Sequence, residues 1–270
     1  MKLDDYIYRG SFSFYDKKLQ ALVQNELPPE KWDSNTGHGP YDILRYYVSD
    51  TFEKLWDERE EAPQEERDRY IYEGATGLCF NTGLQDNNWQ NIYFCCIKND
   101  RTDKQLWKFI GFYNSYNIYS APCKVPAVAV EALRRPNYFK DPSALVFDVR
   151  LDIVPQWNHI IGDEENFNRI PVSIRNMGRE FCRNIIEGAI RTAKKRIESN
   201  YKTAVPQWYR NRIQLLVPLY LTNPNRPDLA LVVSKSEDGT QYLGHTCLTI
   251  DMAYSNARLI TKPESFWLLL

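Results

Sequence analysis

The chain has 270 residues, of which 43% are hydrophobic and 26% are charged, and its formal net charge is −1. A nearly neutral chain is not a polycation that coats nucleic acid through bulk charge, although a local basic face stays open. No apolar run approaches the roughly 18 residues that a membrane span needs, and the chain starts with acidic residues where a signal segment would be apolar. We therefore expect a cytoplasmic protein.

Several common site motifs are absent from the sequence. It has no phosphate loop of the P-loop type, no G-x-G-x-x-G turn after a strand and no C-x-x-C pair. The three histidines, His38, His159 and His245, are not spaced as a metal pair on one helix. We expect no metal and no cofactor, and we expect the six cysteines to be reduced and mostly buried.

The first half of the chain predicts helices followed by a strand meander. Residues 1–39 are expected to be irregular, with a short helix over 17–26, and a clearer helix begins at Pro40. Apolar residues three and four apart give that helix a buried face, and its acidic continuation over 57–68 is expected to be solvated. Three strands are predicted at 78–84, 91–97 and 105–113, and a short helix at 126–135. The buried face is Leu44, Tyr47, Val48, Thr51, Phe52, Leu55 and Trp56.

The second half predicts one long helix among strands. Alternation over 144–154 indicates a strand with one wet side. The clearest helix runs over 174–201 and ends before Pro206, and further strands are expected at 213–221, 229–233 and 242–250. Asp251 is placed to cap a last helix that runs to Ile260 and is stopped by Pro263. The apolar stripe of the long helix is Ile174, Met177, Phe181, Ile185, Ala189, Ala193, Ile197 and Tyr201.

These elements indicate an α+β fold with a mixed, mostly antiparallel sheet, packed by one long basic amphipathic helix and several shorter helices. We predict an irregular segment over 1–39 and a single domain over 40–270. Two tightly packed halves are the alternative.

Positive charge is concentrated on the long helix. Between Arg175 and Lys202 there are eight basic residues and three acids, and four-residue spacing should place Arg175, Arg179 and Arg183 on one face. Such a face suits a phosphate backbone, and the aromatic and basic residues that follow suit single-stranded nucleic acid. The alternative is a solvated face that pairs with the acidic segment 50–73. The candidate binding residues here are Arg191, Lys194, Lys195, Arg196 and Lys202, and the mixed stretch is Tyr201, Lys202, Trp208, Tyr209, Arg210 and Arg212.

Two further groups are candidates for chemistry. His159, just after a strand, has Arg169 in the same loop, so it could act as acid or base on a phosphodiester, or simply fix the loop through its ring. We expect His245 to pack or face solvent. In the last helix, spacing places Asp251, Tyr254 and Arg258 on one side, where they and Asn256 could bind a phosphate or ribose. The alternative is that Asp251 only caps the helix and pairs with Arg258.

Several strings carry a resemblance to a known family. The most specific strings form two groups. The first is the strand 213–221 with Pro227 to Val233, and the second is Thr246 to Tyr254 with Asn256 to Ile260, Pro263 and Trp267-Leu268. Five shorter strings also match: Tyr201 to Gln207, His159-Ile160, Asn168-Arg169, Phe80 to Leu84 and Lys98-Asn99. From about Tyr41 onward the chain resembles the uncharacterised family catalogued as domain of unknown function 3825. Ile170 stands where that family is expected to have an aromatic residue, and Ser255 where it is expected to have asparagine.

The family implies no activity, but domains of this kind accompany cold-shock and other RNA-binding modules, which implies RNA. Three hypotheses follow. The first is an RNA-binding or RNA-processing protein, with His159 and Asp251 as candidate catalytic residues. The second is an enzyme acting on a small nucleotide or phosphorylated ligand, clamped by Arg169, Lys202 and Arg258. The third is a protein-interaction module that uses the acidic segment.

Overall fold

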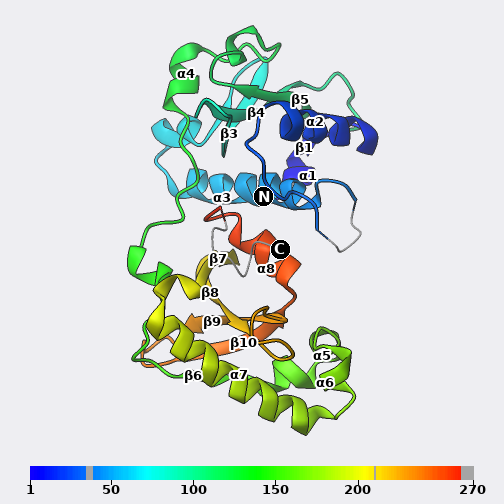
Figure 1. Cartoon of the computed structure of the whole chain (residues 1–270). Helices are drawn as coiled ribbons and strands as arrows, with labels where there is room; N and C mark the ends of the chain where they lie inside the picture. The colour runs from blue at the N-terminus through cyan, green and yellow to red at the C-terminus, as the bar shows by residue number, and fades with distance from the viewer. Residues whose placement is uncertain (35–38, 210, 263–270) are drawn as a thin grey trace. The chain divides into compact units, whose positions relative to one another are not determined.

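The computed structural model describes residues 1–34, 39–209 and 211–262, and it divides into two compact units, Met1–Asn137 and Tyr138–Leu270 (Figure 1). His38, Arg210 and Pro263 lie outside the described residues. Each unit contains one five-stranded sheet. The α+β class is therefore confirmed with two mixed, mostly antiparallel sheets, and the single domain over 40–270 stays a prediction. None of the described helices is long and apolar enough to cross a membrane.

The sheet of the N-terminal unit has the order β1-β5-β4-β3-β2, and every neighbouring pair is antiparallel except β1 with β5. The predicted three-strand meander is confirmed as β3, β4 and β5. The strands are β1 (Ile7–Tyr8), β2 (Ile71–Glu73), β3 (Gly77–Gln85), β4 (Asn91–Lys98) and β5 (Trp107–Asn114). The α-helices are α1 (Leu3–Tyr6), α2 (Phe12–Asn25), α3 (Asp42–Glu61) and α4 (Ala127–Ala132), and 3-10 turns cover Gln64–Arg69 and Ile118–Ser120.

Aromatic rings form much of the core of this unit. Phe94 stacks between Phe80 and Phe109, with ring centroids 4.8 Å and 4.2 Å away, and Phe52 of α3 approaches Phe80 at 5.4 Å. Such ring pairs add to the free energy gained from the area they bury. A second cluster includes three cysteines, Cys79, Cys95 and Cys123. All six cysteines of the chain are buried, as expected.

Two predictions about the second helix need correction. The helix begins at Asp42, not at Pro40, because Tyr41 adopts a left-handed conformation with φ 55°. The acidic continuation is not wholly solvated, since Glu58 is only 6% exposed. Its Oε1 accepts from Lys54 at 2.9 Å and from the backbone N–H of Asn137 at 3.0 Å, which offsets part of the loss of water, whereas its buried Oε2 has no hydrogen-bond partner within the described residues.

The sheet of the C-terminal unit has the order β6-β10-β9-β8-β7, with only β6 and β10 parallel. The strand β7 was not expected from the sequence, in which Pro206 was interpreted only as the stop of the preceding helix. That strand lies at the sheet edge, where proline is tolerated. The strands are β6 (Ile153–Pro155), β7 (Val205–Tyr209), β8 (Arg212–Leu219), β9 (Leu229–Lys235) and β10 (Tyr242–Leu248). The α-helices are α5 (Glu164–Phe167), α6 (Val172–Arg175), α7 (Arg179–Ser199) and α8 (Ile250–Ala257).

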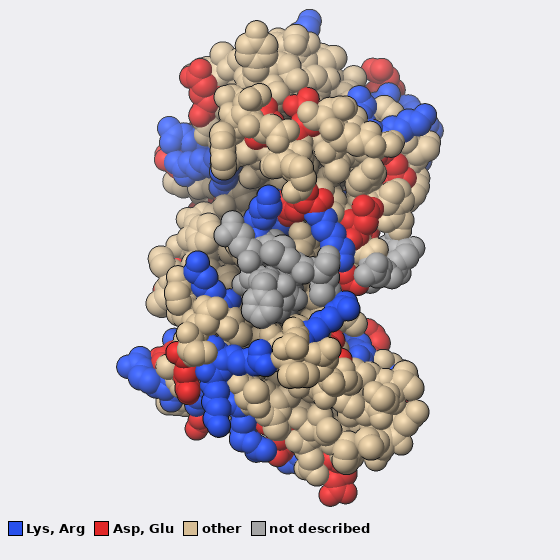
Figure 2. Space-filling model, viewed as in Figure 1, with Lys and Arg blue, Asp and Glu red and all other residues tan. Residues whose placement is uncertain are grey.

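The predicted helix over 174–201 is two helices. Gly178, with φ 95°, separates α6 from α7, so Arg175 does not share a helix face with Arg179 and Arg183. The predicted apolar stripe also differs from the buried face of the helix near its start, because Met177, which was part of the stripe, is 61% exposed. The solvent side of α7 is rich in Lys and Arg (Figure 2). The residues of α7 that are buried are Cys182, Ile186, Ala189, Ile190, Ala193 and Ile197.

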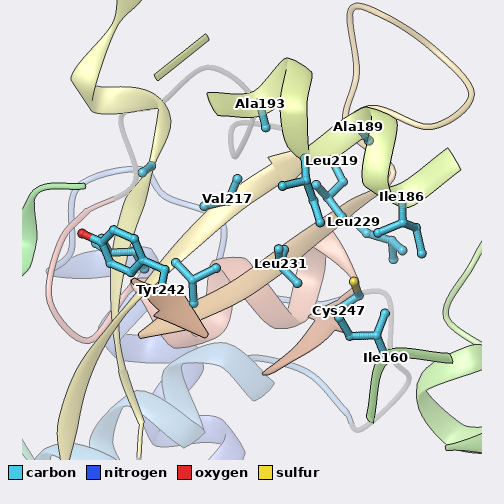
Figure 3. Packing of buried hydrophobic residues seen from close by; sticks show 14 of the residues in the cluster. Ile160, Ile186, Ala189, Ala193, Val217, Leu219, Leu229, Leu231, Tyr242 and Cys247 are labelled. Carbon is cyan, nitrogen blue, oxygen red and sulfur yellow. The ribbon is translucent and has the colours of Figure 1, made fainter. Parts of the chain in front are cut away.

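The two faces of this second sheet are covered by different helices. On β8, Leu215, Val217 and Leu219 belong to the core that α7 completes, together with residues of the neighbouring strands such as Leu231 (Figure 3). Because side chains alternate along a strand, Arg212 and Gln214 lie on the opposite face. That opposite face is where α8 packs, against β7, β9 and β10.

Two smaller predictions were wrong. The strand expected over 144–154 is only the short β6, because residues 142–145 form a 3-10 turn and Asp148 folds back to accept hydrogen bonds from Arg150. The predicted buried side holds only in part, since Phe147 is 3% exposed and Leu151 packs on the same core, whereas Val149 is 37% exposed. Thr249, not Asp251, caps α8 by accepting from the backbone N–H of Met252.

Candidate functional site

A cavity of about 460 Å³ lies on the face of the second sheet that α7 does not cover. It is formed by β7, β8, β9 and β10, by α8, and by the segment between β6 and α6. A volume of this size is typical of sites for small molecules. The lining residues are Gln156, His159, Asn166, Arg169, Gln207, Tyr209, Arg212, Gln214, Val232, His245, Thr246, Leu248, Met252 and Asn256.

The chemistry of this lining favours an anion. It contains two arginines, two histidines and five side-chain amides, and no Asp or Glu of the described chain is part of it. Since no described carboxylate stands in the wall itself, the charge of Arg212, and that of Arg169 so far as Glu165 outside the wall does not offset it, create a local potential that attracts negative ligands. The pocket therefore differs from the rest of the molecule, where acids and bases are nearly balanced.

The two arginines of the pocket are held differently. The Arg169 side chain is only 15% exposed, and it donates to the carbonyl oxygen of Cys247 at 3.2 Å and to Glu165 at 2.6 Å. Arg212, at the start of β8, is exposed, and its side chain has no hydrogen bond or ion pair within the described residues. Arg169 is thus fixed in place, and Arg212 is a cation whose charge is not neutralised by the protein.

His159 lies in a π-helical turn, Asn158–Gly162, and its side chain is exposed at the pocket. The amide of Asn166 donates to the His159 carbonyl at 2.8 Å and ties the turn to α5. Within the part of the chain that the structure describes, neither ring nitrogen of His159 has a hydrogen-bond partner. The imidazole is consequently available to a ligand, and the alternative that its ring fixes the loop has no hydrogen bond in the described residues to support it.

His245 reaches the same pocket because of a β-bulge. The register between β10 and β9 shifts between Gly244 and Thr246, which lets two successive residues, His245 and Thr246, line the pocket. The ring of His245 is engaged at both nitrogens, with the Ser234 hydroxyl 2.6 Å from Nε2 and Gln156 Oε1 3.1 Å from Nδ1. His245 therefore anchors Gln156 and leaves no nitrogen for a ligand.

Burial is the main cause of a lowered pKa for His245, and the positive charges of Arg212 and His159 add to it. The effect keeps His245 neutral, which suits a ring that donates from one nitrogen and accepts at the other. Arg212 and both histidines line the same pocket.

Three amides form a hydrogen-bonded series, which we call the amide relay: Asn256, Gln207 and Gln214. The Asn256 side chain donates to Gln207 Oε1 at 3.1 Å, and Gln207 Nε2 donates to Gln214 Oε1 at 3.0 Å. Gln207 is 1% exposed and Gln214 3%, so both are buried polar residues whose hydrogen bonds matter for stability. They face each other in register on β7 and β8.

Family comparison gives one match. A family described as Domain of unknown function (DUF3825) matches residues 23–267, which is most of the chain. The chain belongs to this family. No curated protein and no solved structure matches it.

Only some of the residues predicted from the sequence line the pocket of this DUF3825 chain. His159, Arg169 and Asn256 do so. Of the predicted clamp of Arg169, Lys202 and Arg258, only Arg169 contributes to the wall. Asp251, Tyr254 and Arg258 share a side of α8 that is not the pocket side, since Met252 and Asn256 are the α8 residues in the wall, and Tyr254 is buried.

The predicted basic residues of α7 lie away from this pocket of the DUF3825 chain, because α7 covers the other face of the sheet. Lys194 pairs with Asp152 at 2.6 Å, and Arg196 donates to the Pro224 carbonyl and lies over the Tyr220 ring. Arg191 and Lys195 are exposed and have no partner within the described residues. The carboxylates that pair with α7 cations belong to the same unit: Asp152, Glu164 and Glu187.

The sequence did not identify Gln156, Asn166, Gln207, Gln214 and Thr246 as site residues. One signal was present: Gln207 and Gln214 each stand next to an apolar residue, Trp208 and Ile213, in segments that form adjacent strands. Tyr209 and Arg212 were part of the mixed aromatic and basic stretch, where they were assigned to nucleic acid.

Proposed function

We propose that the C-terminal unit binds a small phosphorylated ligand in the pocket of β7 to β10 and α8. One observation carries this proposal: the wall holds two arginines and two histidines and no carboxylate of the described chain. Arg212 supplies an unpaired charge, and Arg169 supplies a guanidinium that is already oriented by Cys247. Guanidinium groups form paired hydrogen bonds with phosphate oxygens, so both suit this ligand.

His159 is the acid or base of the proposal. An imidazole with unengaged nitrogens at a phosphate site can take a proton from an attacking hydroxyl or water. In its protonated form it can give that proton to the leaving oxygen of a phosphate ester. His245 does not share this role, because Ser234 and Gln156 occupy both of its nitrogens.

The sequence-based hypothesis of RNA held along α7 has less support. Several cations of that helix are paired with carboxylates, and the helix lies on the other face of the sheet from the pocket. Arg191 and Lys195 are the observation in its favour. RNA on α7 is therefore the second proposal, with a test of its own.

Binding of inorganic pyrophosphate and ribose 5-phosphate, measured by isothermal titration calorimetry, tests the first proposal. We expect Arg212→Ala to weaken binding at least about tenfold, because one charge-assisted contact to an ionic group contributes about 1.5–3 kcal/mol. Arg191→Ala, which removes an equally unpaired arginine from α7, is the matched control and should leave affinity unchanged. Absence of binding by the unaltered chain, or an equal loss in both variants, would refute the proposal.

A further inference from the structure

The amide relay makes a distinctive surface in the pocket wall. Its two hydrogen bonds run in the same direction: Asn256 donates to Gln207, and Gln207 donates to Gln214. Gln207 uses both ends of its amide, so its orientation is determined by its two neighbours. The series therefore leaves the oxygen of Asn256 as an acceptor at one end and the nitrogen of Gln214 as a donor at the other.

Two buried glutamines are costly unless they serve a partner. Their mutual hydrogen bond offsets part of the desolvation, but apolar side chains at these two positions would avoid that desolvation altogether. Elsewhere on the same sheet face the strands do carry apolar residues, such as Leu216 and Ala230. The two glutamines are thus buried polar residues at positions that line the pocket.

Thr246 gives a second, independent observation. Its hydroxyl oxygen is buried and has no hydrogen-bond partner within the described residues, yet Thr246 lines the pocket. A buried hydroxyl without a partner costs free energy that a hydrogen-bonding ligand would recover. The hydroxyl and the relay together offer donors and acceptors from three elements, β8, β10 and α8.

The remaining wall suits a flat ring. Val232, Leu248 and Met252 are apolar, and Tyr209, which is 45% exposed, lies two residues from Gln207 on the same face of β7. Aromatic side chains stack on planar heterocycles, and apolar side chains cover their faces. A sugar phosphate would meet the polar groups with its hydroxyls, but it has no flat apolar face for these residues.

We infer that the phosphorylated ligand is a nucleotide, and that the amide relay and Thr246 recognise the hydrogen-bonding edge of its base. Glutamine and asparagine amides match the donor and acceptor pattern of a base edge. The inference rests on the proposed phosphate-binding function, since Arg169, Arg212 and His159 hold the phosphate in both.

The test compares ligands that differ only in the base. Ribose 5-phosphate and the four common nucleoside 5′-monophosphates are titrated into the full chain by calorimetry. We expect at least one nucleotide to bind about tenfold or more tightly than ribose 5-phosphate, and the four to differ among themselves, because sites that pair with polar groups reject ligands lacking them.

Variants then assign the effect to the relay. Asn256→Leu should lower the affinity for the preferred nucleotide toward that for ribose 5-phosphate, and leave ribose 5-phosphate binding within about threefold. Asn184→Leu, the same change at an exposed position of α7, is the control and should change neither. Arg212→Ala should instead weaken both ligands, which separates phosphate binding from base recognition.

The outcomes distinguish the two proposals. If ribose 5-phosphate binds as tightly as every nucleotide, base recognition is wrong and phosphate binding stands. If neither binds, both are wrong. If Asn256→Leu fails to fold, the ranking of the five ligands with the unaltered chain still decides the inference.

Discussion

Ser234 of β9 and His245 of β10 are hydrogen-bonded through their side chains, with the serine hydroxyl oxygen 2.6 Å from the histidine Nε2. The second ring nitrogen meets Gln156, so the imidazole connects three segments of the C-terminal unit. The β-bulge at Gly244 to Thr246 is what makes this connection possible.

This arrangement predicts how stability depends on pH. The pKa of His245 is lowered from its ordinary 6.5 in the folded chain, so the unfolded chain takes up a proton first on acidification. The stabilisation is therefore complete above pH 6.5 and is lost as pH falls toward the lower folded pKa. Urea unfolding between about pH 5 and pH 8 should show a shallower loss of stability on acidification for His245→Gln than for the unaltered chain. If the dependence of stability on pH is unchanged in His245→Gln, its assignment to His245 is wrong. His159→Gln, at an exposed histidine, is the control and should retain most of the loss of stability on acidification.

Arg169 is predicted to stabilise the fold as well as the ligand site. Its guanidinium joins the segment after α5 to the carbonyl of Cys247 on β10. Arg169→Ala should lower the free energy of unfolding by about 1–3 kcal/mol, because the substitution removes a hydrogen bond from a charged donor to a buried carbonyl. Glu165→Gln neutralises only a partner of the same arginine that is 84% exposed, so it should lower the free energy of unfolding much less. Equal losses, measured by urea unfolding, would assign the effect to the ion pair.

Two ion pairs with the same helical spacing should differ in their contribution to stability. Lys54–Glu58 is 6% exposed on both sides, whereas Arg183–Glu187 is 50% and 36% exposed. Lys54→Met leaves the Glu58 carboxylate buried without its cation and should cost about 3–5 kcal/mol. Arg183→Met should cost less than about 1 kcal/mol, because water screens the exposed pair. Similar losses for the two variants in chemical denaturation would show that burial does not decide the difference.

Replacement of two glycines by alanine should change the stability of the chain in opposite directions. At Gly77 an added Cβ would overlap the carbonyl oxygen of Cys123, so the backbone must move. We expect Gly77→Ala to destabilise the N-terminal unit by about 1–3 kcal/mol or more. Gly188 lies within α7 with open space around it, and Gly188→Ala should stabilise the chain by about 0.5–1 kcal/mol. Thermal unfolding of the two variants checks both signs.

The proposal of RNA on α7 has its own test. Reversing the charge at Lys194, Lys195 and Arg196 should abolish RNA binding without unfolding the chain, if the helix holds phosphates. Lys194 and Arg196 already bind groups of their own unit, so Arg191→Glu with Lys195→Glu is the sharper variant. Fluorescence anisotropy with single-stranded RNA in a salt series should show lower affinity, and a salt slope reduced by about one for each phosphate that the helix no longer neutralises. The same affinity and slope as the unaltered chain would dismiss this proposal.

The sequence by itself determined the elements whose pattern is local. Alternating and helical spacing of apolar residues located β3 to β5, β8 to β10 and most of α7, because burial of one face imposes a short period on neighbouring residues. The family resemblance, carried by the strings near the C-terminus, was also present in the sequence and was confirmed.

Only the tertiary structure decided which residues form the pocket. Gln207 and Gln214 meet because β7 pairs with β8 in one register, and a slip of one residue would turn them to the α7 face. His245 joins them through a bulge, and Asn256 through the packing of α8. These contacts depend on strand pairing and helix packing between distant segments, which no local period encodes, so the sequence could name His159, Arg169 and Asn256 as candidates but not the amides that accompany them.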